Sequence, residues 1–191
     1  MKILGIRQDF GPVGRELPEV VLTTDSSLLT ARKPFFVPEF AERFVARPCL
    51  VARVSRLGKN VARRFASRYY DAFALGMAVE AEGLRESFGE AGAGAIANAF
   101  DGAAIVGDFA ATAVLGERLT ATVCGDTLLD CLMAEAQAVT DAAIEYVSRY
   151  FMLKMGDMIF VSHIGPLREL IPETVVQGTL NGSELLHFKV K

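Results

Sequence analysis

A pair of carboxylates and one arginine are the residues of this sequence that could most readily take part in catalysis or ligand binding. Glu80 and Glu82 form a Glu-x-Glu pair, and the alternation of a strand would place both side chains on one face. Such a pair can ligate a hard divalent cation or work as a catalytic acid–base, and Arg47 could then clamp the carboxylate of a substrate. The alternative is a solvated strand end, where charged pairs are commonly exposed.

The other reactive side chains are few. Cys49 could act as a nucleophile only with a base nearby, and the alternative is a small buried apolar residue. His163 follows a predicted buried strand and is the candidate acid–base residue there, the alternative being an ordinary surface-loop histidine. His187 lies in the last predicted strand, where we expect a structural role. The sequence has three cysteines, Cys49, Cys124 and Cys131, and their spacing is not that of a metal site. We therefore expect three reduced thiols.

Composition excludes several classes of protein. The chain has 191 residues, of which 51% are hydrophobic, so we expect one globular domain spanning residues 1–191. A net charge of −3 gives no reason to expect a nucleic-acid partner. No apolar run approaches ~20 residues, and the N-terminus lacks the long apolar region of a signal peptide. We therefore expect a cytoplasmic protein without a membrane partner.

Residues 140–161 are the clearest stretch of the scaffold that must position these side chains. Thr140 can cap a helix through its hydroxyl, and apolar residues follow it at helical spacing. Gly156 and Asp157 then form a turn signal. Residues 158–161 are apolar and predict a short buried strand.

The remaining segments favour strands over helices. Residues 60–70 predict one short helix, and residues 89–94, rich in glycine and alanine, predict a mobile crossing loop. The other predicted elements are strands at residues 1–6, 19–24, 49–55, 71–82 and 185–190, a loop at 9–18, and hairpin turns at 125–126 and 181–182. Short strands, hairpins and few helices predict an α+β, strand-dominated domain.

The run from Tyr150 to Asp157, YFMLKMGD, and the strand after it resemble a signature of the fumarylacetoacetate hydrolase family. The family version is an aromatic residue, Thr-Leu, two variable residues, Gly-Asp and a short Ile/Val strand. Phe100-Asp101 and the order of strand, Gly-Lys-Asn turn, helix and strand around residue 60 also match. The resemblance covers about residues 20–190. It implies a mixed β-sandwich or β-roll with a few peripheral helices, in a protein that dimerises.

The resemblance also implies a chemistry. The family acts on 2-oxo and diketo acids, and a Mg²⁺ held by a Glu-x-Glu pair and an Asp stabilises an enolate-type oxygen. In this sequence those three positions are Arg47, Cys49 and Ala78, so their formal charge changes from −3 to +1. A like-charge contact near 4 Å costs about 4 kcal/mol at an effective dielectric of 20. We therefore expect no cofactor, and Mg²⁺ or Mn²⁺ only if the site has moved to Glu80 and Glu82.

The other functional positions implied by the resemblance are also changed. Thr23 and Asn98 replace lysines, Glu82 replaces an arginine, and Arg85 replaces a glutamine. The leading hypothesis is a catalytically degenerate homologue that keeps the fold and the homodimer and binds a small carboxylate through Arg47 and Arg85. The alternative is an active hydrolase, isomerase or decarboxylase of 2-oxo or diketo acids with a relocated or metal-free site.

Overall fold

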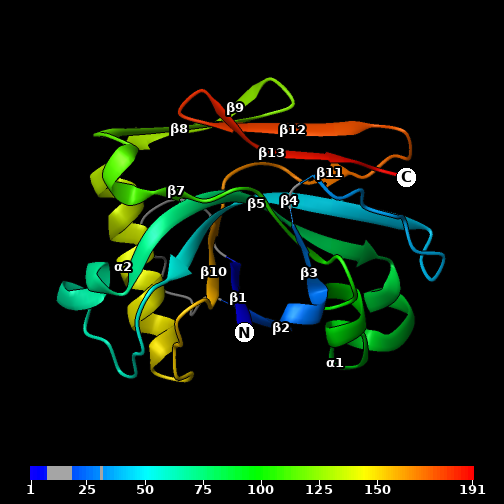
Figure 1. The fold of residues 1–191 in the computed structure, drawn as a ribbon. Helices are drawn as coiled ribbons and strands as arrows, with labels where there is room; N and C mark the ends of the chain where they lie inside the picture. The colour runs from blue at the N-terminus through cyan, green and yellow to red at the C-terminus, as the bar shows by residue number, and fades with distance from the viewer. Residues whose placement is uncertain (8–18, 31) are drawn as a thin grey trace.

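The structure, a computed structural model, describes residues 1–7, 19–30 and 32–191. It is dominated by strands, which confirms the predicted α+β class. The strands lie in two sheets that stack in Figure 1, with the smaller sheet on top. The predicted loop at residues 9–18 lies outside the described residues. None of the helices in the described part of the chain is long and apolar enough to cross a membrane.

The larger sheet has nine described strands in the order β2-β1-β10-β4-β5-β6-β3, with β11 beside β4 and β7 beside β5. Most neighbours are antiparallel, but β1 runs parallel to β10 and β3 runs parallel to β6. The strands are β1 Lys2–Arg7, β2 Glu19–Thr24, β3 Leu28–Thr30, β4 Arg43–Val54, β5 Tyr70–Glu82, β6 Ala104–Val106, β7 Ala110–Ala111, β10 Met158–His163 and β11 Arg168–Glu169. The long antiparallel pair β4 and β5 lies in the middle of this strand order (Figure 1).

The smaller sheet has four described strands in the order β13-β12-β8-β9. They are β8 Arg118–Val123, β9 Asp126–Leu132, β12 Val175–Leu180 and β13 Ser183–Lys189. Both predicted hairpins are present here. Asn181 and Gly182 have φ values of 49° and 78°, as the favoured two-residue hairpin turn requires. The other turn was predicted at residues 125–126, but Cys124 and Gly125 make it, with φ values of 51° and 87°, and Asp126 already begins β9.

Helix α2, Met133–Ser148, begins seven residues before the predicted start at Thr140. The prediction of a cap at Thr140 was wrong, because this buried hydroxyl donates instead to the carbonyl of Ala136 at 2.8 Å. The backbone N–H of Leu132 donates to Glu135 Oε2 at 2.8 Å, which supports the true start. A threonine inside a helix can satisfy its hydroxyl in this way, so its presence did not mark a boundary.

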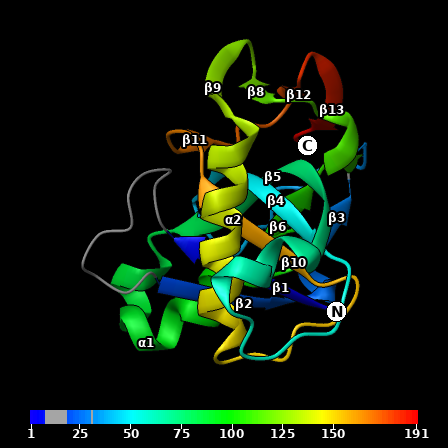
Figure 2. The ribbon, with the colours of Figure 1, turned by 90° about the vertical axis from the view of Figure 1, so that its left-hand side faces the viewer.

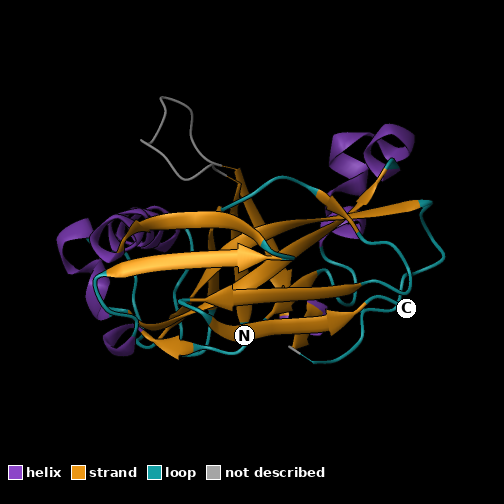
Figure 3. Cartoon of the chain, turned by 90° about the horizontal axis from the view of Figure 1, so that it is seen from above, coloured by secondary structure: helices purple, strands orange, loops and turns teal. Residues whose placement is uncertain are grey.

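Helix α1, Leu84–Asn98, replaces the predicted mobile loop at residues 89–94. Its Leu84, Ala93 and Ala97 are buried in the main hydrophobic core, and this packing overrides the weak helix preference of the glycines. Gly89 interrupts the helix with φ 71° and ψ 162°. The predicted helix at 60–70 is a single 3-10 helix, η2, at Arg63–Arg68, and two further short ones are η1, Asp25–Ser27, and η3, Thr112–Val114. Helices α1 and α2 lie at opposite ends of the large sheet (Figures 1 and 3).

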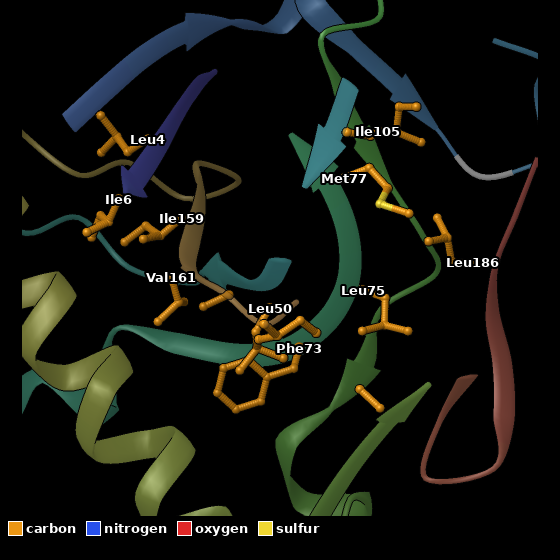
Figure 4. Close-up of a cluster of buried hydrophobic side chains, with 14 of the residues drawn as sticks. Leu4, Ile6, Leu50, Phe73, Leu75, Met77, Ile105, Ile159, Val161 and Leu186 are labelled. Carbon is orange, nitrogen blue, oxygen red and sulfur yellow. The ribbon is translucent and has the colours of Figure 1, made fainter. Parts of the chain in front are cut away.

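The two faces of the large sheet carry different side chains. On one face, buried residues such as Leu50, Leu75 and Met77 join the main hydrophobic core (Figure 4). Their chain neighbours point the opposite way, because successive side chains alternate across a strand. Cys49 and Phe160 belong to a second, smaller cluster on that opposite face. The strand alternation thus separates the core from the surface where a site can form.

The Gly-Asp turn of the family-like signature has a structural role. Asp157 is fully buried and accepts hydrogen bonds from the backbone N–H groups of Lys2 and Lys154, each at 2.8 Å. Its carboxylate also pairs with Lys2 Nζ at 2.6 Å. Gly156 has φ 87°, which glycine adopts without strain. The turn therefore ties the start of β1 to β10, although 155 residues separate them in the sequence.

Candidate ligand-binding cleft

A cleft lies on the face of the large sheet that is turned away from the main core, and its empty space, including its opening to solvent, is about 630 Å³. Its walls come from β1, β2, β4, β5, β6, β10 and the end of α1, elements that are far apart in the sequence. The lining residues are Ile3, Gly5, Val21, Thr23, Arg47, Ala78, Val79, Glu80, Asn98, Ala103, Ala104, Phe160 and Leu167.

Five of the positions singled out in the sequence line this one cleft: Thr23, Arg47, Ala78, Glu80 and Asn98. The register of the central strands explains the convergence. Arg47 on β4 is directly opposite Ala78 on β5, and Glu80 follows two residues later on the same side of its strand. Positions spread over 76 residues of sequence therefore share one surface.

Cys49 lies beneath this surface. It is fully buried, and its thiol lies 3.2 Å from the carbonyl oxygen of Arg47, to which it donates. Burial raises the pKa of the Cys49 thiol to about 12, outweighing the opposing effects of a backbone hydrogen bond and of the Arg47 charge. The group is thus a protonated thiol at neutral pH, which favours the apolar interpretation over the nucleophile.

The remaining candidates do not all reach the cleft. Glu82 pairs with Arg43 and does not line the cleft, whereas Glu80 does. The backbone of His163 ends β10 opposite Cys49. The side chains of His163 and Arg85 lie outside the part of the chain that the structure describes.

Two polar groups of the cleft lack a charged or hydrogen-bonding partner among the described residues. Arg47 is half-buried, and its guanidinium has no ion pair with any described residue. Thr23 is 6% exposed, and its buried hydroxyl has no hydrogen-bond partner among the described residues. Buried polar atoms are nearly always satisfied, so an orphaned hydroxyl on a cleft wall indicates a missing partner. Asn98, also buried, already donates to the carbonyl of Gly94 at 2.9 Å.

The donor set at the family's metal positions does not fit Mg²⁺ or Mn²⁺. Hard divalent cations take oxygen ligands, mostly carboxylates and carbonyls. Here the three positions present a guanidinium, a protonated buried thiol and a methyl group, at Arg47, Cys49 and Ala78. Within the described ranges, no three His, Cys, Asp or Glu side chains are grouped to hold a metal ion.

Sequence reasoning missed the apolar walls of the cleft. Ile3 and Gly5 come from β1, which reaches the site only because β1 pairs in parallel with β10. Phe160 of β10 was predicted as part of a buried strand but not as a wall of the site. Parallel pairing between distant segments leaves no local sequence signal, so these residues could not be assigned without the fold.

Comparison with known proteins bears on the fold. A fumarylpyruvate hydrolase from Pseudomonas aeruginosa, whose crystals hold Mn²⁺ and pyruvate, is similar with a TM-score of 0.82 and 17% identity over 100% of this chain and 89% of that one. A protein assigned to the fumarylacetoacetate hydrolase family from Yersinia pestis CO92 has a TM-score of 0.82 and 17% identity, covering 100% and 92% of the two chains. A 5-carboxymethyl-2-hydroxymuconate delta-isomerase from Mycobacterium smegmatis has a TM-score of 0.79 and 18% identity, covering 99% and 78%.

Sequence comparison alone gives no relative: neither a family model nor a curated protein matches the chain. The structural likeness covers essentially the whole chain, and it extends to both hydrolases and isomerases. The chain therefore has the fold of the fumarylacetoacetate hydrolase family.

Proposed function

We propose that the cleft binds a small carboxylate through Arg47 without a divalent cation, and that this protein has lost the metal-dependent chemistry associated with its fold. One observation carries the proposal. A half-buried guanidinium without an ion pair among the described residues and an orphaned buried hydroxyl, from Arg47 and Thr23, line the same cleft.

The physical basis is charge-assisted hydrogen bonding. A guanidinium offers paired N–H donors that match the two oxygens of a carboxylate, and the Thr23 hydroxyl can supply a further donor. Hydrogen bonds to charged groups contribute about 1.5–3 kcal/mol each, because both partners are strong. Ile3 and Phe160 form apolar walls that suit a short carbon body. Glu80, on the same cleft, disfavours a second carboxylate beside it, so the ligand is a monocarboxylate such as a simple 2-oxo acid.

The loss of turnover follows from the charges. Reactions that build an enolate oxygen need a Lewis acid or an equivalent positive centre placed at that oxygen. In the proposed site the one positive centre is Arg47, which binds the carboxylate of the ligand and does not stabilise an enolate oxygen. We propose that it acts as a binding or regulatory protein, with the homodimer remaining a prediction from the resemblance.

The test is a thermal melt of the purified protein with pyruvate, Mn²⁺ or both. A ligand at 100 times its dissociation constant stabilises by about 2.7 kcal/mol, which is about 5–10 °C for a chain of this size. We expect a shift with pyruvate alone, no shift with Mn²⁺ alone, and loss of the pyruvate effect in Arg47→Gln. Arg53→Gln is the matched control, because Arg53 is on the same strand but pairs with Asp71 at 2.9 Å outside the cleft.

Two outcomes would contradict the proposal. A Mn²⁺-dependent shift that disappears in Glu80→Gln would indicate a relocated metal site. A pyruvate shift that is equal in both arginine variants would indicate that the ligand binds elsewhere on the molecule.

A further inference from the structure

A second pocket lies away from the cleft and shares no lining residue with it. It is an open depression whose empty space, including its opening to solvent, is about 510 Å³, and it is lined by Arg56, Leu57, Phe65, Arg68 and Tyr69. These residues come from the turn after β4 and from the short helix η2, which packs against α2 (the teal coil beside α2 in Figure 2). The lining therefore combines two guanidinium groups with two aromatic rings and one leucine.

The segment that forms this pocket is strongly basic in an acidic chain. Residues 56–70 contain five lysines and arginines and no acidic residue, whereas the whole chain has a net charge of −3. Two of the five cations are used within the fold: Lys59 donates to the carbonyl of Arg149 at 2.9 Å and Arg63 to that of Ala138 at 3.1 Å. Within the described ranges, Arg56 and Arg68 have no ion pair, so their charges are available to an anion.

One of these guanidinium groups, that of Arg68, lies over an aromatic ring. The Arg64 and Arg68 guanidinium carbons lie 4.7 Å and 5.1 Å from the centre of the Phe65 ring, within the range of a cation–π contact. A guanidinium stacked on a ring keeps its N–H edge for in-plane hydrogen bonds to an oxyanion. Arg68 is thus pre-oriented as a donor, and binding costs it less side-chain entropy than a free arginine would lose.

The turn beneath the pocket is also fixed. Gly58 exchanges two backbone hydrogen bonds with Leu153, at 3.0 Å and 2.8 Å. A Cβ atom at position 58 would lie 2.6 Å from the Tyr69 ring, so the glycine is needed for the close approach of the turn to that ring. The half-buried Tyr69 and the 67% exposed Leu57 leave an apolar surface beside the two arginines.

We propose that this pocket binds the phosphate group of a small phosphate monoester with a planar or apolar body. Two guanidinium groups match the charge of about −2 that a phosphate monoester carries at neutral pH, and their forked donors match its oxygens. Leu57 and the edge of Tyr69 contact the organic part. This site is independent of the carboxylate cleft, so either proposal can fail without the other.

The experiment uses phenyl phosphate as the probe, with inorganic phosphate and benzoate for comparison. Isothermal titration gives the dissociation constant, and the arginine side-chain NMR signals show which groups respond. We expect phenyl phosphate to bind more tightly than either comparison anion. We expect Arg68→Gln and Arg56→Gln each to weaken it about tenfold or more, as the loss of a charge-assisted hydrogen bond does. Arg68→Lys, which keeps the charge but not the planar stack, should fall between wild type and Arg68→Gln.

Arg118→Gln is the matched control, because Arg118 is an exposed arginine that pairs with Asp130 at 2.7 Å on β8 and β9. It should leave phenyl phosphate binding unchanged, and all variants should keep the wild-type response to pyruvate. If Arg118→Gln weakens phenyl phosphate binding equally, the effect comes from the overall charge of the protein, and the proposal is overturned. Absence of phenyl phosphate binding at millimolar concentration, or tighter binding of benzoate, would also overturn it. Preferential binding of an oligonucleotide that Arg68→Gln abolishes would replace the small monoester with a nucleic-acid phosphate.

Discussion

Acidic residues introduced at the centre of the cleft should create a metal site there. The double variant Arg47→Glu/Ala78→Asp places two carboxylates on directly opposed positions of β4 and β5, and Glu80 lines the same cleft. These three residues would carry a formal charge of −3, whereas Arg47 and Glu80 now cancel. Cys49 is left unchanged, because a glutamate at that fully buried position would destabilise the fold.

The size of the effect follows from the strand geometry. Opposed residues on antiparallel strands have Cβ atoms about 5 Å apart, so two carboxylates there repel by roughly 3 kcal/mol at an effective dielectric of 20. Solvent at the half-buried positions 47 and 78 reduces this to about 1–2 kcal/mol. We expect the metal-free variant to melt below the wild type for this reason. Mn²⁺ at 100 times its dissociation constant should restore about 2.7 kcal/mol, or about 5–10 °C.

The assay is a thermal melt with increasing Mn²⁺, repeated with a chelator. Arg53→Glu is the matched control, because it reverses a charge on the same strand at the exposed pair with Asp71. The prediction is refuted if the wild-type protein gains as much stability from Mn²⁺ as the double variant does. It also fails if Arg53→Glu responds like the double variant, since general charge attraction would then explain the shift.

Two further predictions concern the scaffold and the thiols. Asp157→Ala should lower the free energy of unfolding by about 3–5 kcal/mol, as the loss of one partner from a buried pair does. The reason is that Lys2 and two backbone N–H groups lose their acceptor. Chemical denaturation measures this change, and a loss below about 1 kcal/mol would refute the structural role of the turn. In the folded protein, iodoacetamide should modify the exposed Cys124 first and leave the buried Cys49 unmodified. Because the pKa of Cys49 is raised to about 12, the labelling of this residue should not rise between pH 7 and pH 9. If mass spectrometry detects labelled Cys49 in the folded protein within that range, its burial is refuted.

The sequence predicted best what local chemistry determines. Asn181-Gly182 fixed a hairpin because only a few residue types accept two consecutive positive φ angles. The starts of helices were predicted poorly, because the hydroxyl of Thr140 is satisfied equally well inside α2 and at a cap. The prediction of a crossing loop at residues 89–94 was wrong, because the chain resumes the helical conformation directly after the non-helical residue Gly89.

The candidate site could be predicted only through the family resemblance. Spacing alone gave no reason to bring Thr23 of β2 near Arg47 of β4, since β1 and β10 lie between these strands in the sheet. The alignment of motifs placed both in one pocket, and the structure puts both on one cleft. For Glu80 and Glu82, in contrast, the spacing in the sequence suggested a shared site, but only Glu80 lines the cleft. Strand alternation places them on one side, but Arg43 pairs with Glu82 beyond the edge of the cleft.

Strand alternation also explains how a fold can persist while its site changes. On β4, Leu50 packs into the main core while its neighbour Cys49 belongs to the opposite face. On β5, Met77 and Ala78 divide in the same way, the first into the core and the second onto the cleft. Replacing carboxylates on the cleft face removes charges from a metal position without opening a cavity in the core, whose packing sets most of the stability. A chain with this architecture can therefore change the charges on its cleft surface and retain its fold.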